Sequence, residues 1–281
     1  MALRLTLAAL AERQSRALIL ASLTGWLAVL ALDCMLLVPE LCLSSDAPVE
    51  RLRAIGAFNP PAMLMLAWCA MLLAMMPPLL REPLAHLRRR SFVRRRVRAI
   101  TAFVVGYGAV WLVAGVVLQE ATMAVAAAAN AMGVPMLLAV GAIAVGWQVT
   151  PVRQICLNRC HWLPRLSAFG FAADRDCVSF GLAHGFWCAA SCAPLMLLPI
   201  MAPQIHLPLM ALLSMSLMLE RMAPPRPAAW SLRLPGQSVI VIIVRSMQRR
   251  HASALFSMHG PIPAPSGAAS PLPPGVQPRC D

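Results

Sequence analysis

The chain has 281 residues, of which 59% are hydrophobic and only 12% are charged, and its mean hydropathy is +0.70. A soluble domain carries roughly 25% charged residues, so the composition excludes an ordinary soluble globular protein. The net charge is +13, and every basic residue is an arginine. Because these arginines gather in short loops between apolar runs, they indicate orientation in a membrane rather than nucleic-acid binding.

Six apolar runs are long enough to cross a bilayer, which takes roughly 20 residues. In chain order they are residues 17–38, 62–80, 100–118, 123–147, 180–202 and 204–222. The first run is long for the apolar part of a signal peptide and no small-residue cleavage site follows it, so we expect it to be the first span. The last run is the weakest of the six.

The arginines alternate between the two ends of these runs. The N-terminal segment has three, the loop after the second run eight, the loop after the fourth run four and the C-terminal tail seven, whereas the three other loops hold two in all. Positive charge marks the cytoplasmic side of a membrane protein. The sequence therefore predicts an all-α polytopic bundle of about six transmembrane helices in an inner membrane, with both termini in the cytoplasm.

The same pattern divides the chain into four parts. We expect a cytoplasmic N-terminus at 1–16, a six-helix transmembrane domain at 17–222, a cytoplasmic tail at 223–259 and a disordered Pro-rich tail at 260–281. Residues 239–244 are apolar but too short to span, so they form either an interfacial piece or a shortened seventh helix.

The fifth run contains the most informative pattern. His184, Cys188, Cys192 and Met196 follow one another at intervals of four residues, which places them along one face of a helix. Thiolate and thioether ligands together favour Cu(I), and thiolates with imidazole also suit zinc. The pattern therefore predicts a soft-metal site. Of the four residues, His184 is the one for which packing is the stronger alternative to a ligand role.

Two other runs offer methionines at the same spacing. Met71 and Met75 lie in the second run, and Met210 lies in the sixth. If these faces meet, they complete a Cys/Met site inside the bundle; the alternative is that methionine serves as a flexible apolar filler. Cys156 and Cys160 also lie four residues apart, but their role stays open because zinc modules usually need two closer pairs.

Three segments resemble a bacterial family of predicted metal-binding membrane proteins, domain of unknown function 2182, sometimes labelled copper chaperones. The likeness lies in the second run (Trp68, Met71, Ala74, Met75, Met76, Pro78), the stretch Gln148, Thr150, Pro151, Cys156, Leu157 and Cys160, and the fifth run (Gly185, Cys188, Cys192, Leu195, Met196). The sequence departs from the family where Ser191 replaces a usual cysteine and Ala193 a usual tryptophan. The resemblance implies a membrane protein that handles copper.

These observations lead to one main hypothesis and two alternatives. The main hypothesis is a membrane protein that binds Cu(I), or hands it to an acceptor protein, through Cys188, Cys192, Met196, Met71 and Met75, supplemented by Met210 and His184. The alternatives are a transporter of metal or small solutes, and a structural subunit without a ligand. No Gly-rich phosphate loop, nucleophile elbow or carboxylate pair supports an enzyme. The oligomeric state stays open.

Overall fold

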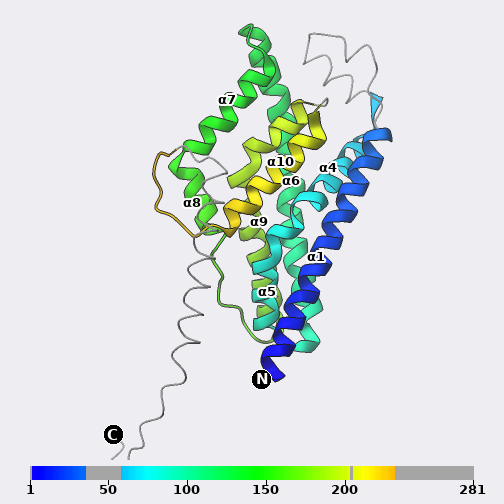
Figure 1. The fold of residues 1–281 in the computed structure, drawn as a ribbon, viewed down its shortest axis with the longest axis vertical. Coiled ribbons are helices and arrows are strands. Elements are labelled where there is room, and N and C mark those ends of the chain that lie inside the picture. The colour runs from blue at the N-terminus through cyan, green and yellow to red at the C-terminus, as the bar shows by residue number, and fades with distance from the viewer. Residues whose placement is uncertain (1, 36–57, 203–204, 232–281) are drawn as a thin grey trace, which may run out of the picture. The chain divides into compact units, whose positions relative to one another are not determined.

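A computed structural model describes residues 2–35, 58–202 and 205–231 of the chain (Figure 1). Within these residues the chain is helical and has no β-strand, which confirms the all-α fold class. The described helices belong to one compact unit, Met1–Ser238, and the other unit, Val239–Asp281, lies outside the described residues. The apolar piece expected at 239–244 and the tail expected at 260–281 therefore lie outside them too.

The helices follow one another with few residues between them, except for an irregular stretch between α8 and α9. In chain order they are α1 Ala2–Met35, α4 Pro61–Met75, α5 Arg81–Arg90, α6 Arg96–Ala131, α7 Met136–Val149, α8 Pro151–Arg159, α9 Gly170–Met201 and α10 His206–Met222, with short 3-10 turns η1 Pro77–Leu80 and η2 Val93–Arg95.

Three described helical segments are long and apolar enough to cross a membrane, namely Ser15–Asp33 within α1, Val93–Ala131 and Gly170–Met201. Two further pairs pass the same test together but are bent, α4 with Pro77–Arg90 by 54° and α7 with α8 by 67°. A proline follows each bend, and proline cannot donate the helical hydrogen bond. The described chain thus has three such helices, or up to five if each bent pair is one span. The expected six spans and cytoplasmic termini stay predictions.

The prediction of a loop between the third and fourth runs, at residues 119–122, is wrong. α6 continues without interruption to Ala131, because the alanine-rich sequence there contains neither glycine nor proline to end it. The break comes later, where Gly133 adopts a φ of +63° and Pro135 precedes α7. The expected fourth span is therefore divided between the end of α6 and α7.

The fifth and sixth runs both form helices, with one difference in bounds. α9 begins at Gly170, ten residues before the expected start at Phe180. This polar first section is held by Asp174, whose carboxylate oxygens lie 2.6 Å from the guanidinium groups of Arg95 and Arg98. α10 has 17 residues, so it is shorter than the three segments that are long enough to cross a membrane.

α6 and α9 pack closely through glycines. A Cβ atom on Gly106 would lie 2.5 Å from the carbonyl oxygen of Val178, and one on Gly181 would collide with the carbonyl oxygen of Phe103. Gly181 and Gly185 form a small-xxx-small pattern, which lets membrane helices approach backbone to backbone. This contact fixes the position of the α6 side chains, along the helix axis, relative to those of α9.

α4 is held between α1 and α6. Gly25 of α1 lies against the backbone of Ala74, whose carbonyl oxygen accepts a 2.5 Å hydrogen bond from Ser22. On the other side, the Trp68 indole donates a 2.9 Å hydrogen bond to the carbonyl oxygen of Trp111 in α6. These contacts bring the methionines of α4 into the bundle core.

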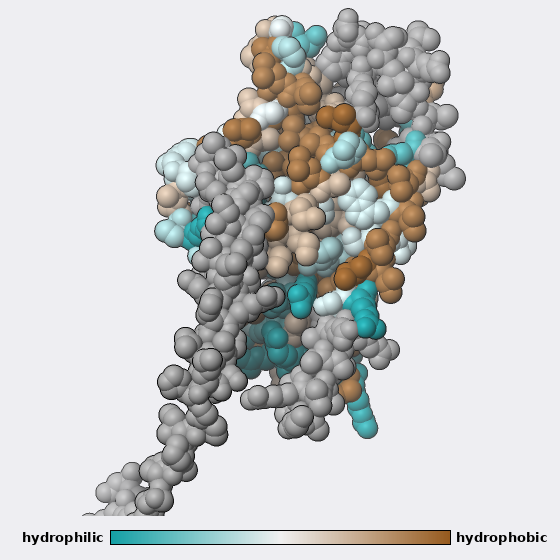
Figure 2. All heavy atoms as spheres, in the orientation of Figure 1, coloured by the Kyte–Doolittle hydropathy of each residue, from teal (hydrophilic) through white to brown (hydrophobic). Residues whose placement is uncertain are grey.

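The outward faces of the helices are strongly apolar. Leu20 and Leu27 of α1 and Val105 and Val113 of α6 are each more than 60% exposed. Figure 2 shows such hydrophobic residues spread over the described helices, with hydrophilic residues gathered toward the lower end. Large exposed apolar surfaces of this kind are typical of proteins that contact lipid.

Candidate metal centre

The two thiols of α9 lie together at the centre of the bundle. Cys188 and Cys192 are each 1% exposed, and Met196, one turn further along, is fully buried. The thiol of Cys192 donates a 3.1 Å hydrogen bond to the carbonyl oxygen of Cys188, one turn earlier on the helix. The helix alone therefore presents two adjacent soft donors, with a thioether on the same face.

A tyrosine that the sequence analysis missed completes the immediate surroundings of Cys188. Tyr107 is the one tyrosine in the chain, and its hydroxyl lies 3.5 Å from the sulfur of Cys188, within hydrogen-bonding distance. The close approach of α6 to Gly185 positions it there. The available signal was a single phenol inside an apolar run, where a buried hydroxyl normally finds a partner.

His184 occupies a separate aromatic environment one turn before Cys188. Its ring lies 5.9 Å from that of Phe103, 6.1 Å from Tyr107 and 5.9 Å from Phe180, measured between centroids. Its Nδ1 atom has no hydrogen-bond partner within the described residues. In the same part of the chain, no three His, Cys, Asp or Glu side chains form a group that could hold a metal ion. The structure thus brings the two cysteines together but adds no third ligand of these types.

The expected methionines all lie in the same buried core as the two cysteines. Met71 is 5% exposed, Met75 1% and Met210 fully buried. They come from α4, which packs against α1 and α6, and from α10, which packs against α9. Thioether ligation by these residues stays a prediction.

The second cysteine pair lies on the short helix α8. The Cys160 thiol donates a 3.2 Å hydrogen bond to the carbonyl oxygen of Cys156, and both residues are buried. Thr150 caps the first turn of this helix by accepting a 3.2 Å hydrogen bond from the backbone N–H of Arg153. α8 packs directly against α9, so this pair is buried on a packed helix rather than placed in a surface loop.

Sequence analysis also missed a buried ion pair between α8 and α10, two helices that pack against α9. The guanidinium of Arg153 in α8 pairs with the carboxylate of Glu220 in α10, and the Arg153 side chain is 1% exposed. Nothing in the local pattern of either helix could show this pairing, because its partners are 67 residues apart.

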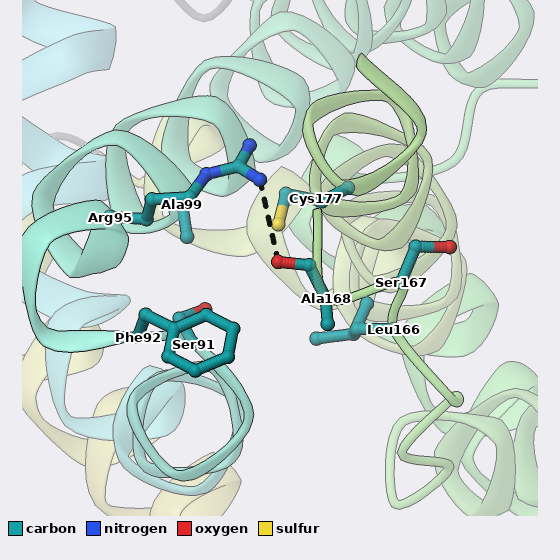
Figure 3. Close-up of a pocket in the computed structure, with 9 residues that line it drawn as sticks. Ser91, Phe92, Arg95, Ala99, Leu166, Ser167, Ala168 and Cys177 are labelled. Atoms are coloured by element: carbon teal, nitrogen blue, oxygen red, sulfur yellow. Dashed lines mark hydrogen bonds between the residues drawn. The ribbon is translucent and has the colours of Figure 1, made fainter. Parts of the chain in front are cut away.

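Two further groups of residues contain none of the expected ligands. Asp33 of α1 lies 3.7 Å from Nδ1 of His206 and is partly exposed. A small pocket is lined by Ser91, Phe92, Arg95, Ala99, Leu166, Ser167, Ala168, Ala173 and Cys177. Figure 3 shows the guanidinium of Arg95 reaching the carbonyl oxygen of Ala168 across it. None of the expected ligands lines this pocket.

Comparison with known proteins gives one match. The family model PpoB2, described as a copper chaperone, matches residues 65–244. The matched region begins in α4 and includes all seven candidate ligands. No curated protein and no solved structure matches the chain.

Proposed function

Because this chain belongs to the PpoB2 copper chaperone family, we propose that it binds Cu(I) through Cys188 and Cys192 and hands the ion to an acceptor protein. The observation that carries this proposal is the pair of buried cysteines one turn apart on α9, with the Cys192 thiol hydrogen-bonded to the Cys188 carbonyl oxygen. Met196 lies on the same face, and thiolate with thioether is the donor set that favours Cu(I). A chaperone role is non-catalytic, and the chain has no motif that argues for an enzyme.

Each thiol would lose its proton on binding, because the thiolate is the metal ligand. Met196, Met71, Met75 and Met210 are the thioethers proposed to complete the coordination, and His184 is the weakest candidate because aromatic rings surround it. A soft ion in this buried setting would be shielded from water, and transfer would proceed by exchange of sulfur ligands with the acceptor.

We propose a bacterial inner-membrane location, with the bilayer as the principal surrounding of the bundle. In this topology α10 is the sixth span, residues 17–222 form the membrane domain, and 1–16, 223–259 and 260–281 lie in the cytoplasm. The arginine distribution and the exposed apolar side chains of α1 and α6 support it. Attaching a reporter after residue 16 and another after residue 231 would test both ends.

The copper site is tested by elemental analysis of the full-length chain, purified in detergent from copper-supplemented cells. We expect copper in the wild type and none in the Cys188→Ser/Cys192→Ser variant. Cys177→Ser is the matched control, since Cys177 is a buried cysteine of the same helix that lies beside the pocket of Figure 3. Equal copper in the wild type and the double variant would refute the site.

A transporter is the second candidate, and the two bent helix pairs favour it. Discontinuous helices at mid-membrane are frequent where transporters bind their substrates. Uptake of labelled copper into proteoliposomes distinguishes the two functions, because a chaperone need not move the ion across a bilayer. Copper binding without uptake supports the chaperone; saturable uptake that requires Cys188 and Cys192 supports the transporter. A folded chain that neither binds nor moves copper supports a purely structural role.

A further inference from the structure

The last turn of α5, η2 and the first turn of α6 form an arginine-rich stretch that the proposed function does not use. Residues 88–98 contain seven arginines and no acidic residue. Arg89, Arg90 and Arg94 are exposed, and none of them forms a hydrogen bond or an ion pair within the part of the chain that the structure describes. Three guanidinium groups are therefore available to an anion from outside the chain.

This stretch is fixed against the start of α9. The guanidinium of Arg95 donates a 3.1 Å hydrogen bond to the carbonyl oxygen of Gly170 and a 2.6 Å hydrogen bond to the carboxylate of Asp174. The ring of Phe92 stacks on that of Phe169, with 5.1 Å between their centroids. These contacts place aromatic rings beside the exposed arginines, in one surface that we call the basic surface. Its members are Arg89, Arg90, Arg94, Phe92 and Phe169.

The aromatic side chains of the basic surface are open to the outside. Phe92 is 54% exposed and Phe169 is 72% exposed, although their rings stack on each other. Large apolar side chains that are exposed beside arginines are typical of segments at a membrane interface. There the apolar groups enter the boundary of the lipid tails, while the charged groups stay among the headgroups. The basic surface offers both kinds of contact.

The basic surface is also continuous with the outward apolar face of α6. Val97 and Val104 are both exposed and lie seven residues apart, which places them on one face of this helix. Val93, which directly precedes Arg94, is exposed as well. Val97 comes three residues before the apolar run that begins at residue 100, which is about 4.5 Å of helix. In a bilayer around α6, these arginines would therefore lie where the lipid tails give way to the headgroups.

We propose that the basic surface binds the headgroups of anionic phospholipids in preference to zwitterionic ones. The inference rests on the proposed membrane location and does not depend on copper. Guanidinium groups bind phosphate through two parallel hydrogen bonds, and clustered positive charges beside a membrane attract anionic lipids. An acidic surface of another protein would match the charges, but it would leave the exposed valines and phenylalanines without the apolar surroundings that lipid tails supply.

The test measures the lipid retained by the full-length chain, immobilised in detergent and exposed to micelles with equal amounts of phosphatidylglycerol and phosphatidylcholine. Mass spectrometry of the eluted lipids gives their ratio. We expect the wild type to prefer phosphatidylglycerol, and Arg89→Gln/Arg90→Gln/Arg94→Gln to lose most of this preference, since each arginine near an anionic membrane strengthens binding roughly fivefold. The matched control, Arg89→Lys/Arg90→Lys/Arg94→Lys, keeps the charge and should keep the preference. Size-exclusion chromatography verifies that each variant is folded.

Equal retention of the two lipids by the wild type would refute the inference, and it is the result expected if the basic surface docks an acidic protein instead. A preference that the triple glutamine variant keeps would also refute it, because the lipid would then bind elsewhere. Should that variant fail to fold, the salt dependence of the wild type decides. Raising NaCl from about 0.1 to 1 M screens exposed charges and should remove the preference, whereas a preference that salt leaves unchanged contradicts binding by arginine.

The same preparations separate this inference from the proposed copper function. Copper content is measured beside the lipid ratio, and the glutamine variant should bind as much copper as the wild type. A wild type that prefers phosphatidylglycerol but holds no copper supports the inference and refutes the copper site alone. A chain that does not sediment with the membranes of the cells that express it refutes the membrane location and this inference together, and leaves the copper site standing.

Discussion

The contact between α6 and α9 can be tested with two glycines that lie two residues apart on α6. A Cβ atom on Gly106 would lie 2.5 Å from the carbonyl oxygen of Val178, whereas one on Gly108 would meet nothing within 4 Å. Alanine gains about 0.5–1 kcal/mol over glycine inside a helix, and overpacking costs about 1–3 kcal/mol. We therefore expect Gly106→Ala to destabilise the protein by about 1–2 kcal/mol and Gly108→Ala to stabilise it slightly.

Thermal unfolding in detergent measures this difference, followed with a thiol-reactive dye that labels cysteines as they become exposed. A loss of 1–2 kcal/mol corresponds to a fall in the midpoint of roughly 3–6 °C for a domain of this size. Gly106→Ala should also weaken copper binding, because it moves Tyr107 away from Cys188, while Gly108→Ala should bind as the wild type does. The reasoning is refuted if Gly106→Ala is as stable as Gly108→Ala, since the helices would then not be in backbone contact.

Three further predictions follow from the thiol centre. Tyr107→Phe removes the hydroxyl 3.5 Å from the sulfur of Cys188 and should weaken Cu(I) binding several-fold, as measured by competition with bicinchoninate. This effect is about the size of one hydrogen bond to a charged group. Unchanged affinity would show that the hydroxyl plays no part. Bound copper should be lost as the pH falls, because protons compete with the ion for the thiolates; a pH-independent copper content would contradict ligation by cysteine. In the metal-free, folded chain, Cys69 should react with maleimide before Cys188 and Cys192, because it is partly exposed while they are buried. Mass spectrometry of the labelled peptides measures the order of reaction. Equal labelling of the three cysteines would mean that the centre is open to solvent.

The helices could largely be predicted from the sequence, because apolar length is a local property. The error at residues 119–122 has a local origin as well: the polar residues Gln119 and Glu120 interrupt the apolar run, yet polar residues do not stop a helix that alanines continue. The break in the helix comes at Gly133 and Pro135, which lie 13 and 15 residues beyond Glu120. Backbone chemistry, rather than polarity, sets this boundary.

The candidate centre could be predicted only where one helix supplies it. Cys188 and Cys192 share α9, so their spacing alone indicated that they would lie side by side. Tyr107, Arg153 and Glu220 come from three other helices, and their approach depends on how α6, α8 and α10 pack against α9. The glycine contacts and the bend before α8 determine that packing, and although Gly181 and Gly185 mark a close contact, neither feature shows which helix will be the partner.

The length of α6 has a consequence for the surface that the protein offers outside a bilayer. Its 36 residues correspond to about 54 Å of helix, against a hydrocarbon core of about 30 Å. Even at the largest tilts found for membrane helices, about 40°, it would still rise about 41 Å. In the proposed membrane topology, roughly 11 Å of α6 therefore stands clear of the lipid tails, as a rigid extension of the helix that carries Tyr107.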